Sequence, residues 1–175
     1  DIAVLSLGDI VVDKTIRIAG DEMDQDIIDY VRDKYNMLIG ERTAEDVKIA
    51  IGSAAPLDEE QVVVIQGRDL ISGLPKSIEF SSVEVREAIL NSIVQITDAI
   101  KDAIEETPPE LLTDLLTSGI KLAGGGALIR GIDKLWQEEL NVPVHIVNDP
   151  MSAVARGPAL MLDHIQLLEK IQRSW

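Results

Sequence analysis

The sequence predicts an α/β protein in which the two ends of the chain form a sheet-based part and the middle forms an inserted, largely helical part. β-rich runs occur near the start, over residues 2–18, and return at 120–123 and 142–147. The longest amphipathic segment, residues 82–105, lies between them. Strands at both ends that enclose a mostly helical middle are typical of a chain with an inserted subdomain.

The chain opens with a predicted β-hairpin followed by a helix. Residues 2–7 and 10–18 are rich in β-branched residues, and Gly8-Asp9 between them is a strong hairpin signal. After the hairpin, apolar residues recur at helical spacing, which predicts a helix from Asp21 to about Asn36.

A second helix and a pair of strands are predicted next. Thr43 with Asp46 three residues later resembles a capping box, although Glu or Gln is the usual partner, and it predicts a short helix that ends near residue 51. Residues 61–66 and 76–80 are expected to form two strands, which a loop containing two glycines connects.

The longest predicted helix covers about residues 82–105. A Pro108-Pro109 pair separates it from a shorter helix that ends at Gly119. The apolar stripe of the helix at 82–105 consists of Val85, Ile89, Ile93, Ile96, Ile100 and Ile104.

The last third of the chain alternates strands and helices. We expect strands at 120–123 and 142–147, with a helix at 132–140 between them. A final helix is predicted over 159–172, because Gly157-Pro158 should interrupt any helix that begins earlier. Its buried side would comprise Leu162, Ile165, Leu168 and Ile171.

The most informative motif is the run of three glycines that follows the strand at 120–123. Gly124, Gly125 and Gly126 have no Cβ, so a ligand can approach their backbone closely. We expect a helix that begins near Leu128 to point its free N–H groups at this turn, as in nucleotide sites. The spacing matches neither a P-loop nor a Rossmann fingerprint, and a plain tight turn is the alternative interpretation.

Composition excludes several classes of function. The chain has 31 acidic and 16 basic residues, a formal net charge of −15, so we expect no nucleic-acid partner. It has no cysteine, which rules out disulfides and thiolate metal sites and fits a cytoplasmic protein. No apolar run approaches the roughly 20 residues that span a bilayer.

Four segments together resemble the actin-like ATPases, and most closely the MreB family of bacterial cell-shape proteins. The resemblance covers essentially the whole chain. The segments are the opening D-I-A-V-L-S-L (1–7), G-E-R-T-A-E-D-V-K (40–48), L-A-G-G-G-A-L (122–128) and D-P-M-S-A-V-A-R-G (149–157).

The resemblance implies specific binding residues and a fold. Glu45 and Lys48, three apart on one helix face, match the family's E-x-x-K pattern, in which the carboxylate accepts from ribose hydroxyls and the lysine lines the adenine. The alternative is an ordinary surface ion pair. The turn formed by Gly124, Gly125, Gly126 and Ala127 would hold the adenosine side of ATP. The implied fold is a ribonuclease-H-like subdomain (1–21 and 107–175) with an inserted α+β subdomain (22–106), and a first lobe absent from this chain.

The implied function is that of the ATP-binding half of a bacterial actin homologue. Such proteins polymerise into filaments at the inner face of the cell membrane, where they direct cell-wall synthesis together with cell-elongation membrane proteins. We expect ATP as cofactor, with Mg²⁺ in the intact protein, slow hydrolysis there, and membrane attachment through the absent lobe. We expect no catalytic group or metal ligand in this chain, and no turnover by it alone. Two alternatives stay open: the lobe of an actin-fold chaperone ATPase, or a non-hydrolysing scaffold lobe.

Overall fold

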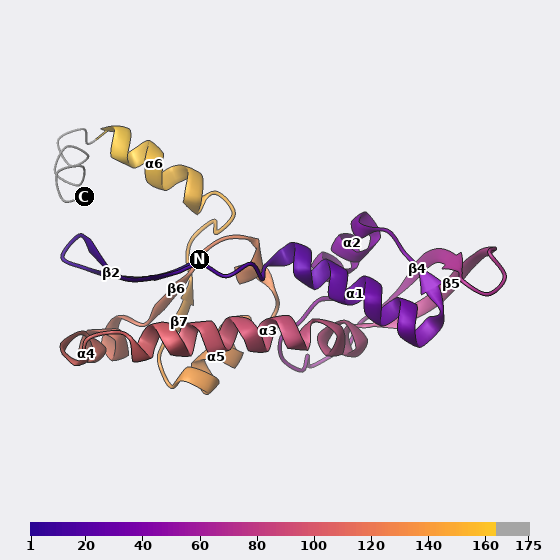
Figure 1. The fold of residues 1–175 in the computed structure, drawn as a ribbon, viewed down its shortest axis with the longest axis horizontal. Helices are drawn as coiled ribbons and strands as arrows, with labels where there is room; N and C mark the ends of the chain where they lie inside the picture. The colour runs from indigo at the N-terminus through magenta and orange to yellow at the C-terminus, as the bar shows by residue number, and fades with distance from the viewer. Residues whose placement is uncertain (164–175) are drawn as a thin grey trace.

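The computed structural model describes residues 1–163, which form an elongated molecule with one long helix running along most of its length (Figure 1). In chain order, the elements are β1 (Ile2–Ser6), β2 (Asp9–Lys14), α1 (Gly20–Tyr35), β3 (Met37–Leu38), α2 (Glu41–Ile51), β4 (Val62–Asp69), β5 (Pro75–Ser81), α3 (Ser82–Glu105), α4 (Pro109–Ser118), β6 (Ile120–Leu122), the 3₁₀ turn η1 (Gly125–Leu128), α5 (Ile132–Leu140), β7 (Val144–Ile146) and α6 (Ala153–Asp163).

The predicted N-terminal hairpin forms, but its turn is Leu7-Gly8 and not Gly8-Asp9, and its second strand ends at Lys14 and not at residue 18. β1 and β2 pair antiparallel, with Val4 opposite Val12 and an irregularity immediately after Val4. Leu7 and Gly8 make the connecting turn, and both have positive φ angles, 53° and 92°. A Gly at the second position relieves the strain of this conformation, which explains the glycine there.

The middle of the chain forms an antiparallel sheet in the order β3-β4-β5. The sequence analysis did not predict β3. It also ended the strand predicted at 61–66 too early, because a glycine at position 67 is typical of a loop. Gly67 lies inside β4 instead. A Cβ at this position would sit 2.4 Å from the carbonyl oxygen of Leu38, so only glycine lets β3 approach so closely.

Helix α2 begins two residues before the predicted start. Its N-cap is Gly40, which has an extended backbone (φ −90°, ψ 162°) and makes no side-chain capping hydrogen bond. The prediction of a Thr43–Asp46 capping box was therefore wrong, since both residues lie within the helix. The residues of α2 that face inward are Ala44, Val47 and Ile51, all of them buried.

Helix α3 has the predicted bounds and connects the two parts of the molecule. Ser81 and Glu84 form a reciprocal capping box at its N-terminus. Its first half packs against β5 and α1, and its far end is tied to the hairpin by Lys14, whose ammonium pairs with Asp102 and Glu106. The hairpin and the β3-β4-β5 sheet lie toward opposite ends of the long axis (Figure 1).

The later part of the chain contains a parallel pair of strands. β6 pairs with β7, with Lys121 opposite His145, and α5 lies between them in sequence. The parallel pairing agrees with the predicted strand–helix–strand order.

The C-terminal helix differs from its prediction. α6 begins at Ala153, six residues before the predicted start, and runs through Gly157 and Pro158 without a break. The turn at Asp149–Ser152 starts it, because the Ser152 carbonyl accepts from the Arg156 N–H. Leu162, predicted to be buried, is 68% exposed. Ile165, Leu168 and Ile171 lie outside the described residues.

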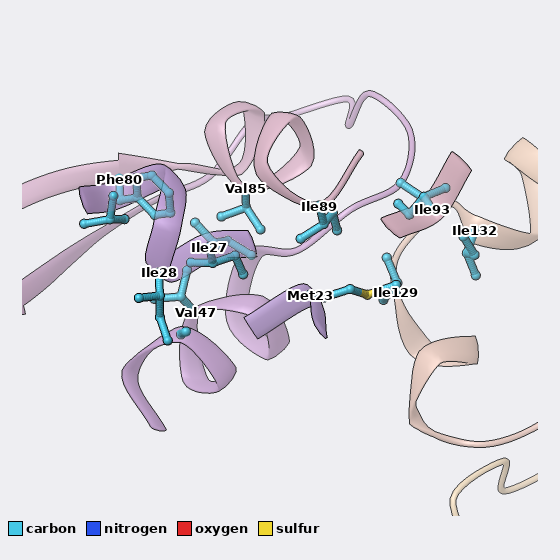
Figure 2. Close-up of a cluster of buried hydrophobic side chains, with 14 of the residues drawn as sticks. Met23, Ile27, Ile28, Val47, Phe80, Val85, Ile89, Ile93, Ile129 and Ile132 are labelled. Carbon is cyan, nitrogen blue, oxygen red and sulfur yellow. The ribbon is translucent and has the colours of Figure 1, made fainter. Parts of the chain in front are cut away.

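A single apolar core joins the inserted part to the rest. It extends from Phe80 and Val85, through Ile89 and Ile93, to Ile132 on α5 (Figure 2). Because residues on both sides of the predicted division at 22–106 share this core, the two parts are packed together along α3.

Candidate functional site

Lys48, on α2, links this helix to α1. Its ammonium donates to the carbonyl oxygen of Gly20 (2.7 Å) and to the Asp24 carboxylate (2.8 Å), both on α1. The lysine side chain is only 13% exposed. The surface ion pair considered for Glu45 and Lys48 is not formed, because Lys48 is held by α1 instead.

Glu45 lies on the wall of an open hollow of about 720 Å³ between α1 and α2. The hollow contains five carboxylates and one guanidinium, so its field favours hydrogen-bond donors over anions. Its lining residues are Asp21, Asp24, Gln25, Glu41, Arg42, Glu45, Asp46 and Ile49.

Sequence reasoning missed most of this lining, and Asp24 in particular. A signal was available: Asp24 lies four residues before Ile28 and seven before Val31, on the buried stripe of α1. A carboxylate on an apolar helix face needs a partner from elsewhere in the fold, and Lys48 is that partner.

The glycine turn presents bare backbone at the surface. Gly124 has a φ of +85°, and its N–H donates to the Pro150 carbonyl (2.8 Å). Gly125 and Gly126 are exposed and have ordinary φ angles. A Cβ on Gly126 would meet nothing within 4 Å, and one on Gly125 would meet only the Met151 sulfur, at 3.3 Å. The fold therefore does not require glycine at these two positions, and their bare backbone leaves room for a ligand to approach closely.

The helix predicted at 132–140 is confirmed as α5, but the helix start expected near Leu128 is not formed. The 3₁₀ turn η1 covers Gly125–Leu128, and α5 begins only at Ile132, after an αL residue at Gly131. The full helix N-terminus that we predicted at this turn is thus absent from it. Ala127 supports the turn, because its side chain is buried and its N–H donates to the Gly124 carbonyl (3.3 Å).

Arg130 fixes the glycine turn relative to α2. Its backbone bridges to Ser53, and its carbonyl accepts from the Ala54 N–H (2.8 Å). Its guanidinium donates to the Ala50 carbonyl (2.8 Å) and to Gln61 Oε1 (3.0 Å). The glycine turn and the C-terminal end of α2 are thereby held as one unit.

The start of α1 adjoins the same unit. Met23, next to Asp24, meets Ile129 in the shared core (Figure 2). The glycines themselves do not line the α1–α2 hollow. The glycine turn and helix α2, which bears Glu45 and Lys48, are therefore joined through Arg130 and the shared core, but they do not line one pocket.

The turn that leads into α6 lies against the glycine turn. Besides the Gly124–Pro150 hydrogen bond, Arg156 donates from its guanidinium to the carbonyls of Asn148 and Asp149, and the Ser152 hydroxyl bonds the Asp149 carboxylate. These contacts hold Asp149 in a left-handed conformation, with φ of 48°.

Residues 1–163 lack two kinds of feature. No three or more His, Cys, Asp or Glu side chains gather in an arrangement suited to a metal ion. Over the same residues, none of the helices combines the length and apolar character needed to cross a bilayer.

Solved structures place this fold among the actin-like proteins. MreB5 of Spiroplasma citri bound to AMPPNP is 42% identical, with a TM-score of 0.91 over 99% of this chain and 51% of that one. The same protein bound to ADP gives a TM-score of 0.92 at 43% identity, over 96% of this chain and 51% of that one. The MamK double helical filament, 23% identical with a TM-score of 0.65, shares the fold over 78% of this chain and 42% of its own.

Sequence comparison identifies the family. The MreB/Mbl protein family matches residues 1–170, and the chain belongs to that family. The cell shape-determining protein Mbl of Bacillus subtilis (strain 168) is 46% identical over 99% of this chain and 52% of its own length. The cell shape-determining protein MreB of Escherichia coli (strain K12) is 42% identical over 95% of this chain and 48% of its own length. The chain thus spans about half the length of the curated relatives it matches.

Proposed function

We propose that this chain is the ATP-binding second lobe of a bacterial actin homologue that assembles into filaments and sets cell shape. The observation that carries the proposal is the pair of exposed glycines, Gly125 and Gly126, attached by Arg130 to the helix that bears Glu45 and Lys48. Relatives over 40% identical were solved with AMPPNP and with ADP, which supports nucleotide as the ligand.

The chemistry of the site fits the adenosine end of ATP better than its phosphates. The acidic hollow repels phosphate, whereas its carboxylates can accept from ribose hydroxyls. The glycine backbone can lie flat against a base or a sugar, because no Cβ intervenes. We therefore assign ribose contact to Glu45, adenine contact to the Lys48 stem, and backbone contact to Gly124, Gly125 and Gly126, with Ala127 shaping the turn.

The remaining parts of the proposal concern the whole protein. The phosphates and their Mg²⁺ would be held mainly by the other lobe, and slow hydrolysis would need both lobes. In this proposal, residues 1–21 and 107–175 form the ribonuclease-H-like subdomain and 22–106 the inserted one. Filaments would lie at the cytoplasmic face of the membrane, attached through the other lobe, with cell-elongation membrane proteins as partners.

Exposed aliphatic side chains at the two ends of the molecule support self-assembly. Leu7 at the tip of the β1–β2 hairpin is fully exposed, and Ile71 in the β4–β5 connection is 83% exposed. The β1–β2 hairpin and the β4–β5 pair lie toward opposite ends of the long axis (Figure 1). A contact between unlike ends is heterologous, and if it does not close on itself it builds a filament.

Sedimentation of the full-length protein tests the proposal. We expect it to pellet with ATP and to pellet less with ADP or without nucleotide, because lobe closure on ATP favours the assembling state. Ile71→Glu should reduce pelleting, whereas Leu90→Glu, a matched change at an exposed residue in the middle of α3, should not. A protein that stays in the supernatant under every condition would contradict assembly.

A further inference from the structure

Glu45 and Lys48 are arranged so that they do not neutralise each other. Residues three apart on a helix are neighbours, and a carboxylate and an ammonium at that spacing ordinarily pair. Here the Lys48 ammonium turns away to Asp24 and Gly20 on α1, and Glu45 forms no ion pair with any of the described residues. The Glu45 carboxylate therefore faces the hollow with its acceptor capacity unused.

The socket that holds Lys48 is built from two residues of α1. Asp24 is 8% exposed and accepts through Oδ2. Gly20 accepts through its carbonyl, and a Cβ on it would come within 3.2 Å of the Lys48 nitrogen. A glycine at this position therefore leaves room for the ammonium.

This socket is not the arrangement that stability alone would favour. A buried ion pair contributes little, because desolvation offsets the attraction. The second oxygen of Asp24, Oδ1, is buried without a hydrogen-bond partner, which is costly. The effect that remains is to fix where the lysine charge lies.

We propose that Asp24 is a positioning residue for nucleotide recognition: it captures the Lys48 ammonium and so keeps Glu45 free to accept hydrogen bonds from the ribose. The inference rests on the proposed ATP-binding function and adds to it a cause for ribose selectivity. Without Asp24, Lys48 would be released to pair with Glu45, and the acceptor would be lost.

The test measures the ratio of the dissociation constants of 2′-deoxyATP and ATP for the full-length protein. We expect the parent to prefer ATP by about tenfold, the value of one hydrogen bond to a charged acceptor. Asp24→Asn should lower the preference to that of Glu45→Gln. Adding Lys48→Met to Asp24→Asn should restore it, because no ammonium is then left to neutralise Glu45. This rescue would not occur if Asp24 only stabilised the fold.

Asp33→Asn is the matched control, since it removes one carboxylate charge from the same helix, α1, outside the hollow and away from Lys48, and it should keep the preference. Equal weakening of both nucleotides by Asp24→Asn, no rescue by Lys48→Met, or an equal effect of Asp33→Asn would each overturn the inference. A parent that binds ATP without preferring it over 2′-deoxyATP would overturn the inference alone. A parent that binds neither nucleotide would overturn the proposed function itself, and the inference with it.

Discussion

At the scale of single residues, the Lys48 ammonium is held by Asp24 from a different helix and not by Glu45, its neighbour on α2. Glu45, Lys48 and the three glycines were recognisable because motif spacing survives in the linear sequence. The Lys48–Asp24 pair was not, because its members lie on different helices and any of several carboxylates could have competed for the ammonium. Proximity in sequence alone predicts that Lys48 pairs with Glu45, but the packing of α1 on α2 brings Asp24 to the Lys48 ammonium instead.

The open space at Gly126 gives a direct test of ligand contact. Gly126→Val should leave the fold intact, because a Cβ at this position meets no protein atom within 4 Å and the backbone needs no positive φ. It should nevertheless weaken ATP binding to the full-length protein at least about tenfold, the effect of overfilling a close contact. Titration with a fluorescent ATP analogue measures this.

Gly157→Val serves as the control, since Gly157 is an equally open glycine, on α6. If Gly126→Val bound ATP as tightly as the parent while remaining folded, the glycine turn would not contact the nucleotide.

At the scale of elements, prediction succeeded where one strong local pattern dominated. α3 has a long apolar stripe and ends before a pair of prolines, and its bounds were predicted correctly. The failures involve competition between local signals and packing. A glycine replaced the expected polar cap of α2, β3 is too short to show a period, and α6 continues through a proline.

The N-terminus of α3 should make stability depend on pH. Burial alone would raise the pKa of Glu84, but hydrogen bonds from Tyr35, Ser81 and Lys34 outweigh it and lower the pKa to about 2. A carboxylate with a depressed folded-state pKa contributes stability above its unfolded pKa and loses it as the pH falls through the folded value. The contribution of Glu84 is therefore complete above about pH 4.5 and disappears towards pH 2.

Glu84→Gln should flatten the fall in unfolding free energy between these two pH values and lower stability at neutral pH. Urea denaturation at a series of pH values measures both effects. Glu79→Gln, on β5, is the matched control. An unchanged slope in Glu84→Gln would show that the capping box does not hold the ionised carboxylate in solution.

At the scale of the whole molecule, the sequence predicted an α/β chain of the actin-like class, and family membership confirms it. The alternative of a chaperone-type lobe is disfavoured, since the matched curated relatives cited above are cell shape-determining proteins. The exact division at residues 22–106 stays a prediction, because one core runs across it.

The whole-molecule proposal also predicts what the isolated lobe does not do. Residues 1–175 should release no phosphate from ATP above the uncatalysed rate, because positioning the phosphates and the attacking water needs the other lobe. A sensitive phosphate-release assay on the purified chain, with circular dichroism to verify folding, measures this. Sustained turnover that scales with protein concentration would contradict the assignment of the hydrolytic groups to the other lobe.

The contact between Lys14 and the far end of α3 affects the order in which the chain can fold during its synthesis. The hairpin strands are synthesised before Asp102 and Glu106, the two residues of α3 that anchor them through Lys14. Until then the hairpin lacks the helix it packs on, and two isolated strands are marginally stable in water. The hairpin therefore reaches its native packing only once α3 is complete, and a growing chain that stalls before that point would expose Val12, which the folded structure buries.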